Sequence, residues 1–135
     1  MKYFLCIYLT ESSLPDFQDL EKSSYIIGRH NSCDIQLVNK FLSRHHATLI
    51  LHPPDKKNDS YYYTLRDGVL RGNKSSNGVW VNSKRIDNSI RLRHKDVITF
   101  GVPCGYPEII FLLERADELN KEEGTFPNEY GTDIQ

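Results

Sequence analysis

The stretch Tyr61-Tyr62-Tyr63-Thr64-Leu65-Arg66-Asp67-Gly68 decides the fold class. Successive side chains of an extended chain point to opposite sides, so residues two apart share a face. One face of this stretch carries two tyrosines and a leucine, and the other carries a tyrosine, a threonine and an arginine. The Asp-Gly pair that ends it is a strong turn signal. A period of two that ends in a turn predicts a β-strand with one more apolar face.

The rest of the chain repeats this arrangement of short apolar runs separated by turn residues. Breakers include the polar loop at residues 53–60 and the Asn77-Gly78 pair. Such spacing predicts an all-β chain folded as an antiparallel β-sandwich. The segment 14–22 is compatible with either a helical turn or a loose loop. We expect strands at residues 2–9, 24–27, 35–37, 47–52, 61–66, 79–82, 97–100 and 109–114.

The composition indicates one folded domain. At 135 residues with 39% hydrophobic residues, the chain can bury one core but is short for two. We place the sandwich at residues 1–114. Residues 115–123 are charged and helix-permissive, and residues 124–135 contain Gly and Pro with little to bury. We therefore expect residues 115–135 to form a charged, mobile tail.

Charge and cysteine content restrict the partners. The 17 Lys and Arg against 18 Asp and Glu give a net charge of -1, which argues against broad binding of nucleic acid or acidic membranes. Cys6, Cys33 and Cys104 are odd in number and lack metal-site spacing, which predicts free thiols in an intracellular, cytoplasmic location. The apolar run at the start is too short for a bilayer span and lacks a small-residue cleavage site.

Four polar motifs follow one another, each in a turn beside a strand-like run. They are Gly28-Arg29, Ser43-Arg44-His45-His46, Asn77-Gly78 and Val81-Asn82. Arginine carries a planar, permanent charge, and a serine hydroxyl beside a cation suits a phosphate with three acceptor oxygens. If one end of a sandwich gathers these turns, they can bind an anion that no single segment could hold.

In order and spacing these motifs resemble the forkhead-associated (FHA) domain, a phosphothreonine-peptide-binding module with an FHA/SMAD-like sandwich and binding loops at one end. The resemblance covers about residues 24–114. It departs from the family at Val79, where Thr is common, and at Ser83, where Gly is common. It implies a signalling module without cofactor or metal, whose partner is a Thr-phosphorylated protein, such as a kinase or kinase substrate.

The resemblance also assigns roles to individual residues. Arg29 is expected to pair with the phosphate, Ser43 to donate its hydroxyl, and Arg44 to add a second charge or a backbone donor. Ser76 and Asn77 are expected to hold the peptide. Four further residues are expected to support the structure of the binding loops, namely Gly28, His46, Gly78 and Asn82.

Peptide selectivity is assigned to Phe41. In the resembled family the residue three places after the phosphothreonine often faces this position. An aromatic ring can cover an aliphatic side chain but cannot pair with a carboxylate, so we expect Leu, Ile or Val there. The other reading is that Phe41 turns inward beside Leu42 as a core anchor.

The sequence does not support a catalytic or metal-binding function. Catalysis by Ser43 with His45 or His46 lacks a Gly-x-Ser-x-Gly elbow, and neighbouring strand residues point apart. The five histidines lack Cys-x-x-Cys or His-Glu-x-x-His spacing for a metal, and no Gly-x-x-x-x-Gly-Lys loop is present for a nucleotide. We therefore do not expect an enzyme. An interaction or scaffold domain that binds its partner independently of phosphate remains the alternative.

Overall fold

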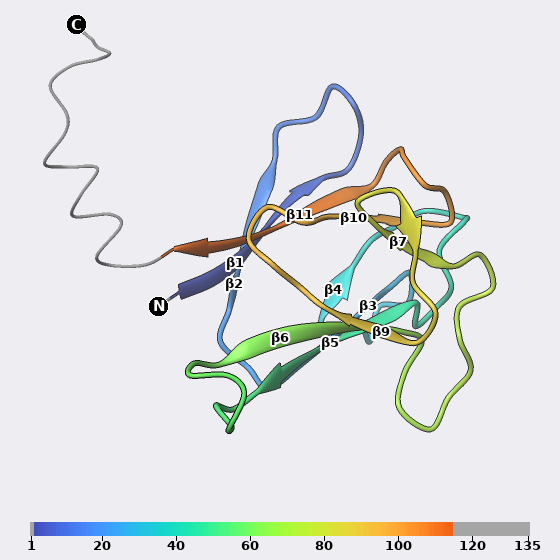
Figure 1. Ribbon diagram of the computed structural model, residues 1–135. Helices are drawn as coiled ribbons and strands as arrows, with labels where there is room; N and C mark the ends of the chain where they lie inside the picture. Colours follow the sequence, from blue (N-terminus) through green and yellow to red (C-terminus); the bar gives the residue numbers. More distant parts are fainter. Residues whose placement is uncertain (1, 115–135) are drawn as a thin grey trace, which may run out of the picture.

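The computed structural model describes residues 2–114, which fold into two facing β-sheets (Figure 1). The predicted tail at residues 115–135 lies outside the described residues. Within residues 2–114 there is no helix that is long and apolar enough to cross a bilayer. The all-β sandwich predicted from the strand-turn pattern is confirmed.

The first sheet has six strands, and every neighbouring pair in it is antiparallel. Strand β1 pairs with β11 over its full length, so that Lys2 lies opposite Glu114. The two ends of the described chain therefore lie side by side (Figure 1). In spatial order the strands are β2 (Asp16–Leu20), β1 (Lys2–Tyr8), β11 (Glu108–Glu114), β10 (Val97–Phe100), β7 (Val79–Val81) and β8 (Lys84–Arg85).

The second sheet has five strands. Its central pair, β5 and β6, is antiparallel, and the short β4 pairs with β3 in the parallel direction, which departs from the wholly antiparallel expectation. In spatial order the strands are β4 (Ile35–Gln36), β3 (Ser24–Gly28), β5 (Ala47–His52), β6 (Tyr62–Asp67) and β9 (Ser89–Arg91).

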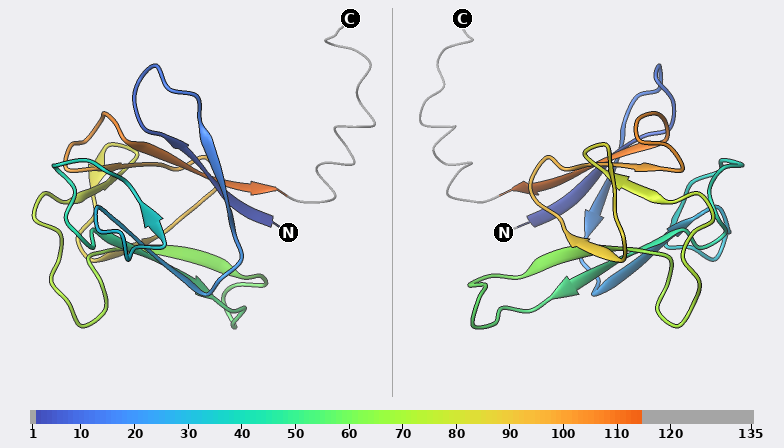
Figure 2. Two further views of the ribbon diagram at one scale, coloured as in Figure 1. Left: turned by 180° about the vertical axis from the view of Figure 1, so that it is seen from behind. Right: turned by 45° about the vertical axis from the view of Figure 1, so that its right-hand side comes forward.

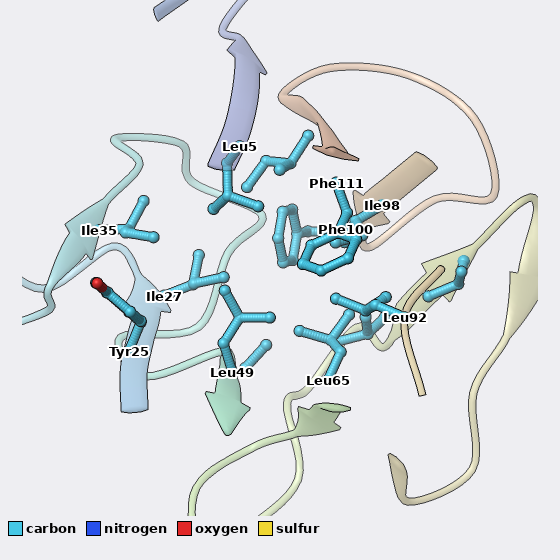
Figure 3. Close-up of a cluster of buried hydrophobic side chains, with 14 of the residues drawn as sticks. Leu5, Tyr25, Ile27, Ile35, Leu49, Leu65, Leu92, Ile98, Phe100 and Phe111 are labelled. Carbon is cyan, nitrogen blue, oxygen red and sulfur yellow. The ribbon is translucent and has the colours of Figure 1, made fainter. Parts of the chain in front are cut away.

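The core lies between the sheets, where apolar side chains of both sheets meet (Figure 3). From the first sheet come Leu5, Ile98 and Phe111, and from the second come Leu49 and Leu65, all of them buried. In β6 the residues Tyr63, Leu65 and Asp67 are buried and those between them are partly exposed, as the predicted alternation requires. Tyr61, which we expected on the same apolar face, lies before β6 and is 53% exposed. Burying each large apolar side chain contributes about 1.5–3 kcal/mol, and this burial is what fixes the strand register.

Three strands were not expected from the sequence. Residues 16–20 form β2 rather than a helical turn or a loose loop, although only Leu20 of this strand is buried. Both residues of β8 and all three of β9 are exposed. These strands carry no apolar alternation because they lie at or next to the sheet edges and are defined by backbone pairing to one neighbour.

The two-residue hairpin turn of the structure lies at a dipeptide that the sequence analysis did not single out as a turn. Asn77-Gly78 does not join two paired strands, since β6 and β7 belong to different sheets. The two-residue hairpin is instead formed by Asn82 and Ser83, between the paired residues Val81 and Lys84. Both have positive φ, 53° and 67°, as a type I′ turn requires. Residue 82, which we expected to end a strand, is therefore the first turn residue.

The loops that carry three of the four polar motifs, all but Val81-Asn82, gather at one end of the sandwich. They are the end of β3, the β4–β5 loop (residues 37–46) and the β6–β7 loop (residues 68–78). This end lies away from the paired ends of β1 and β11, as the two views of Figure 2 show.

Candidate functional site

The approach of β3 to the β4–β5 loop builds the floor of the site. Arg29 N donates to Ser43 O at 3.0 Å, and His30 N donates to Arg44 O at 3.1 Å. A β-carbon on Gly28 would lie 2.2 Å from Arg44 O. Only glycine permits this distance, so Gly28 is what allows the two segments to bond.

His46 holds the two binding loops together. Its ring is fully buried. Ser43 N donates to Nδ1 at 2.9 Å, and Nε2 lies 2.7 Å from Gly78 O. Because Nδ1 accepts a backbone N–H, the ring proton is on Nε2 and is donated to the carbonyl. This placement fits the supporting role expected of His46.

The buried ring must stay neutral to make both bonds. Burial lowers the pKa of His46, an effect that the bond to Gly78 O partly offsets. A second proton on Nδ1 would remove the acceptor that Ser43 N requires. The neutral ring is therefore part of the loop geometry.

The predicted phosphate-binding side chains lie on the outer surface of these loops. Arg29 is exposed, and its Nε donates to Leu42 O at 3.0 Å, which holds the guanidinium beside the β4–β5 loop. Ser43 Oγ accepts from Ser76 N at 3.1 Å, so its hydrogen remains available for donation. Arg44 is exposed, and no described residue pairs with its guanidinium. The three residues thus present several unused donors.

The predicted peptide-holding residues come from the β6–β7 loop. Asn77 is exposed, and its Nδ2 donates to Phe41 O at 2.8 Å. One N–H of the amide therefore ties the two loops together, which leaves the second N–H and the carbonyl oxygen for a ligand. Ser76 is exposed beside it. Gly78 has φ +91°, a backbone conformation that favours glycine at this bend.

Phe41 is not a core anchor. Its side chain is 58% exposed, whereas the adjacent Leu42 is 2% exposed and packs into the core. Lys40 Nζ lies 5.3 Å from the centre of the Phe41 ring. The ring therefore lies on the surface beside Asn77, the position that a selectivity role requires.

Asn82 lies elsewhere. Its Nδ2 donates to Asp96 Oδ1 at 2.9 Å, and its Oδ1 accepts from Val97 N at 3.0 Å. These contacts brace the segment before β10, at the other end of β7 from Asn77. Asn82 does brace a loop, but its described contacts are not to the loops that carry Ser43 and Asn77.

Two supporting residues were missed from the sequence. Asp67 is buried and accepts from Ser75 N at 2.9 Å, and Ser75 Oγ in turn accepts from Gly78 N at 2.9 Å. Together they fix the shape of the β6–β7 loop from inside. The only sequence signal was the position of Asp67 at a strand end beside Gly68, which we interpreted as a turn.

Ser43 does not form a nucleophile–base pair with either neighbouring histidine. His46 contacts the backbone N of Ser43 rather than its hydroxyl, and His45 Nε2 lies 3.2 Å from Ser32 Oγ. The arrangement offers donors and cations around an exposed surface. It is suited to binding an anion.

Comparison with known proteins identifies the family. The model of the FHA domain matches residues 25–101, more than half of the chain, and the protein belongs to this family. FHA domains are interaction modules rather than enzymes. The family match thus supports an interaction module, as the sequence motifs indicated.

Individual proteins are similar to this chain in sequence or in fold. The uncharacterized protein sll1895 of Synechocystis is 42% identical over 83 residues, which are 61% of this chain and 11% of that protein. The chain therefore spans about a tenth of the length of this relative. The crystal structure of the Synechocystis Slr1951 protein has a TM-score of 0.69 and 26% identity, and covers 84% of this chain and 99% of that one. Mycobacterium tuberculosis EmbR, solved in complex with a low-affinity phosphopeptide, has a TM-score of 0.60 and 27% identity over 84% of this chain and 25% of that one.

Proposed function

We propose that this FHA domain binds a phosphothreonine-containing segment of a partner protein through the loops that carry Arg29, Ser43 and Asn77. The observation that supports the proposal most is the gathering of these side chains, with unused donors: Ser43 and Asn77 lie on the two loops that His46 joins, and Arg29 lies beside them at the end of β3. The EmbR complex supports it too, because that related protein was solved with a phosphopeptide. The partner is expected to be a kinase or a kinase substrate.

Arg29 and Arg44 supply the charge, and Ser43 supplies a neutral donor between them. A phosphate monoester carries about -1.5 to -2 charges at neutral pH. Hydrogen bonds to such a group are worth roughly 1.5–3 kcal/mol each, before the cost of ordering the peptide and the side chains. We expect a modest, reversible affinity on the order of micromolar, about -8 kcal/mol.

Phosphothreonine is expected to bind more tightly than phosphoserine. The extra methyl group contributes about 0.8 kcal/mol if it is buried, or roughly fourfold in affinity. The test is a phosphothreonine peptide library, with each selected peptide remade in unphosphorylated and phosphoserine forms. Equal binding of the phosphorylated and unphosphorylated forms would favour the alternative, a scaffold domain that recognises its partner without phosphate.

Arg29→Ala is the variant that tests the site directly. We expect it to weaken phosphopeptide binding by roughly ten- to a hundredfold, because one charge-assisted contact is lost. Calorimetric titration measures the change, and a thermal melt checks that the domain remains folded. Lys57→Ala is the matched control, since Lys57 is an exposed cation in the β5–β6 loop and its side chain takes part in no described ion pair. Unchanged affinity of Arg29→Ala would remove this residue from the site.

A further inference from the structure

A groove lies on the open side of the sandwich, between the two sheets. Strands β8 and β9 are the last strands of the first and second sheet, and residues 86–88 connect them. The groove between them has a volume of about 650 Å³. It is lined by residues of β7, β8, β9 and the loop before β10, so it is separate from the β4–β5 loop that carries Ser43.

The groove has an apolar floor and a cationic rim. Val81 and Ile86 are buried at its base, and Ile90 of β9 is 40% exposed within it. The rim carries the exposed cations Lys84, Arg85, Arg91 and Arg93. An exposed aliphatic side chain surrounded by cations is complementary to a ligand that combines a small apolar group with negative charge.

The two carboxylates in the groove are already engaged. Asp96 accepts from Asn82 Nδ2 through one oxygen and from Arg93 N through the other, at 2.9 and 2.8 Å. Asp87 pairs with Lys74 at 3.3 Å. Arg91 is held over the Tyr62 ring at 4.6 Å, but Lys84 and the Arg93 side chain have no carboxylate partner among the described residues. The groove therefore has an excess of positive charge.

Arg85 connects the groove to the candidate site. Its guanidinium lies against Gly78, the residue after Asn77, and it also lines the groove. A smaller hollow of about 320 Å³, lined by Lys74, Arg85 and Asp87 among others, lies between the β6–β7 loop and the groove. A bound chain that leaves the loops near Asn77 thus passes Lys74 and Arg85 before it reaches the groove.

We propose that this groove binds an acidic segment with an aliphatic side chain, located in the same partner protein whose phosphothreonine occupies the loops. The proposal rests on the proposed function and extends the ligand beyond the phosphorylated residue. The aliphatic side chain packs on Ile90, and the flanking carboxylates pair with Lys84 and Arg93. A protein segment fits better than nucleic acid, because the floor is aliphatic and offers no ring on which bases could stack.

The test compares a short phosphothreonine peptide with two extended versions. Each extension adds Glu-Asp-Leu-Glu-Asp through a Gly-Ser spacer, before the phosphothreonine in one peptide and after it in the other. We expect at least one extension to raise affinity for the wild-type domain by roughly tenfold at low salt, a gain that weakens as salt is added. A version with Leu replaced by Ser should lose part of the gain.

The double variant Lys84→Glu with Arg93→Glu should abolish the gain and leave binding of the short phosphopeptide unchanged. The matched control is Lys56→Glu with Lys57→Glu, which makes the same change of charge in the exposed β5–β6 loop. Loss of the gain in affinity in both double variants would show a general effect of charge and would overturn the proposal that the groove binds the acidic segment. Absence of any gain in the wild type would also overturn it, as would tighter binding of an oligonucleotide than of the acidic peptide.

Failure of the proposed function gives a different result. In that case the short phosphopeptide would not bind, and the isolated acidic peptide would be added to isotope-labelled domain instead. Nuclear magnetic resonance then follows the methyl signals of Ile86 and Ile90. Signals that shift in the wild type but not in the Lys84→Glu/Arg93→Glu variant would support peptide binding in the groove independently of phosphate. Unperturbed signals would overturn it.

Discussion

At the scale of single residues, His46 has the most consequences, because one ring fixes the position of two loops. It receives the N–H of Ser43 and donates to the carbonyl of Gly78, and it has no water contact. Both bonds require one proton on the ring. The geometry around Ser43 and Asn77 therefore depends on the protonation state of a residue that is not expected to touch the ligand.

The first prediction at this scale concerns pH. The folded-state pKa of His46 is lowered by burial, whereas in the unfolded chain it is about 6.5. The unfolded state consequently takes up the proton first as pH falls. The stability that neutral His46 contributes is complete above about pH 6.5 and is lost as pH falls toward the folded-state pKa, at up to about 1.4 kcal/mol per pH unit.

Urea unfolding of the wild type at about pH 7.5 and about pH 5.5 measures this loss, and nuclear magnetic resonance of the imidazole assigns it to His46. The control is His45→Gln, which removes an exposed histidine and should keep the pH dependence. A His46 ring that titrates at or above about 6.5 in the folded domain would contradict the prediction.

A second prediction at this scale concerns the exposed Phe41. Peptides with Leu, Ile or Val three places after the phosphothreonine should bind better than peptides with Asp there. Full burial of such a side chain contributes about 1.5–3 kcal/mol, and partial cover by an exposed ring contributes about half of that. Binding of Leu and Asp peptides to the wild type and to Phe41→Ala measures the preference, which Phe41→Ala should lose.

The neighbouring Lys40 offers the competing outcome. Its ammonium lies near the ring and could pair with the Asp. A preference for Asp that disappears in Lys40→Ala would overturn the role of Phe41.

At the scale of elements, the β7–β8 hairpin contains a turn residue that strains its backbone. Ser83 has φ +67°, a conformation in which a side chain destabilises the folded state by roughly 1–2 kcal/mol. Glycine avoids this strain but loses more conformational entropy on folding, at a cost of about 0.5–1 kcal/mol. Ser83→Gly should therefore raise the free energy of unfolding by about 0.5–1 kcal/mol.

The midpoint of urea unfolding measures the change. Ser12→Gly is the matched control, since Ser12 is exposed and does not have a positive φ, and it should be neutral or destabilising. Equal effects of the two substitutions would show that the turn is not strained.

At the scale of the whole molecule, the two sheets of residues 2–114 share one buried core. Residues 115–135 contain few apolar side chains. Deleting them should therefore leave the melting temperature and phosphopeptide affinity nearly unchanged. A large fall in melting temperature would show that they pack on the domain. A rise in affinity would show that Thr125 or Thr132, once phosphorylated, competes for the loops.

The sequence predicted the parts of the molecule that depend on local pattern or on a known motif. Tyr63 and Leu65 are buried because alternation forces them inward, and this could be read directly. Strands β8 and β9 could not be predicted, because their exposed residues form strands only through pairing with a neighbour. The bond between Asp67 and Ser75 was missed because it too depends on how the chain folds back on itself, with seven residues of loop between the two partners. The gathering of Arg29, Ser43 and Asn77 was anticipated through family resemblance, whereas Asn82 braces a different loop.

The pairing of Lys2 with Glu114 also determines how the domain responds to tension. Chain segments attached at these two residues pull from the same end of an antiparallel pair, so a force between them is applied to one ladder bond at a time. Such a load opens β1 from β11 like a zipper, starting at the edge farthest from the ligand loops. Under such a force, the β1–β11 pair separates at Lys2 and Glu114 before the loops that carry Ser43 and Asn77 change their positions.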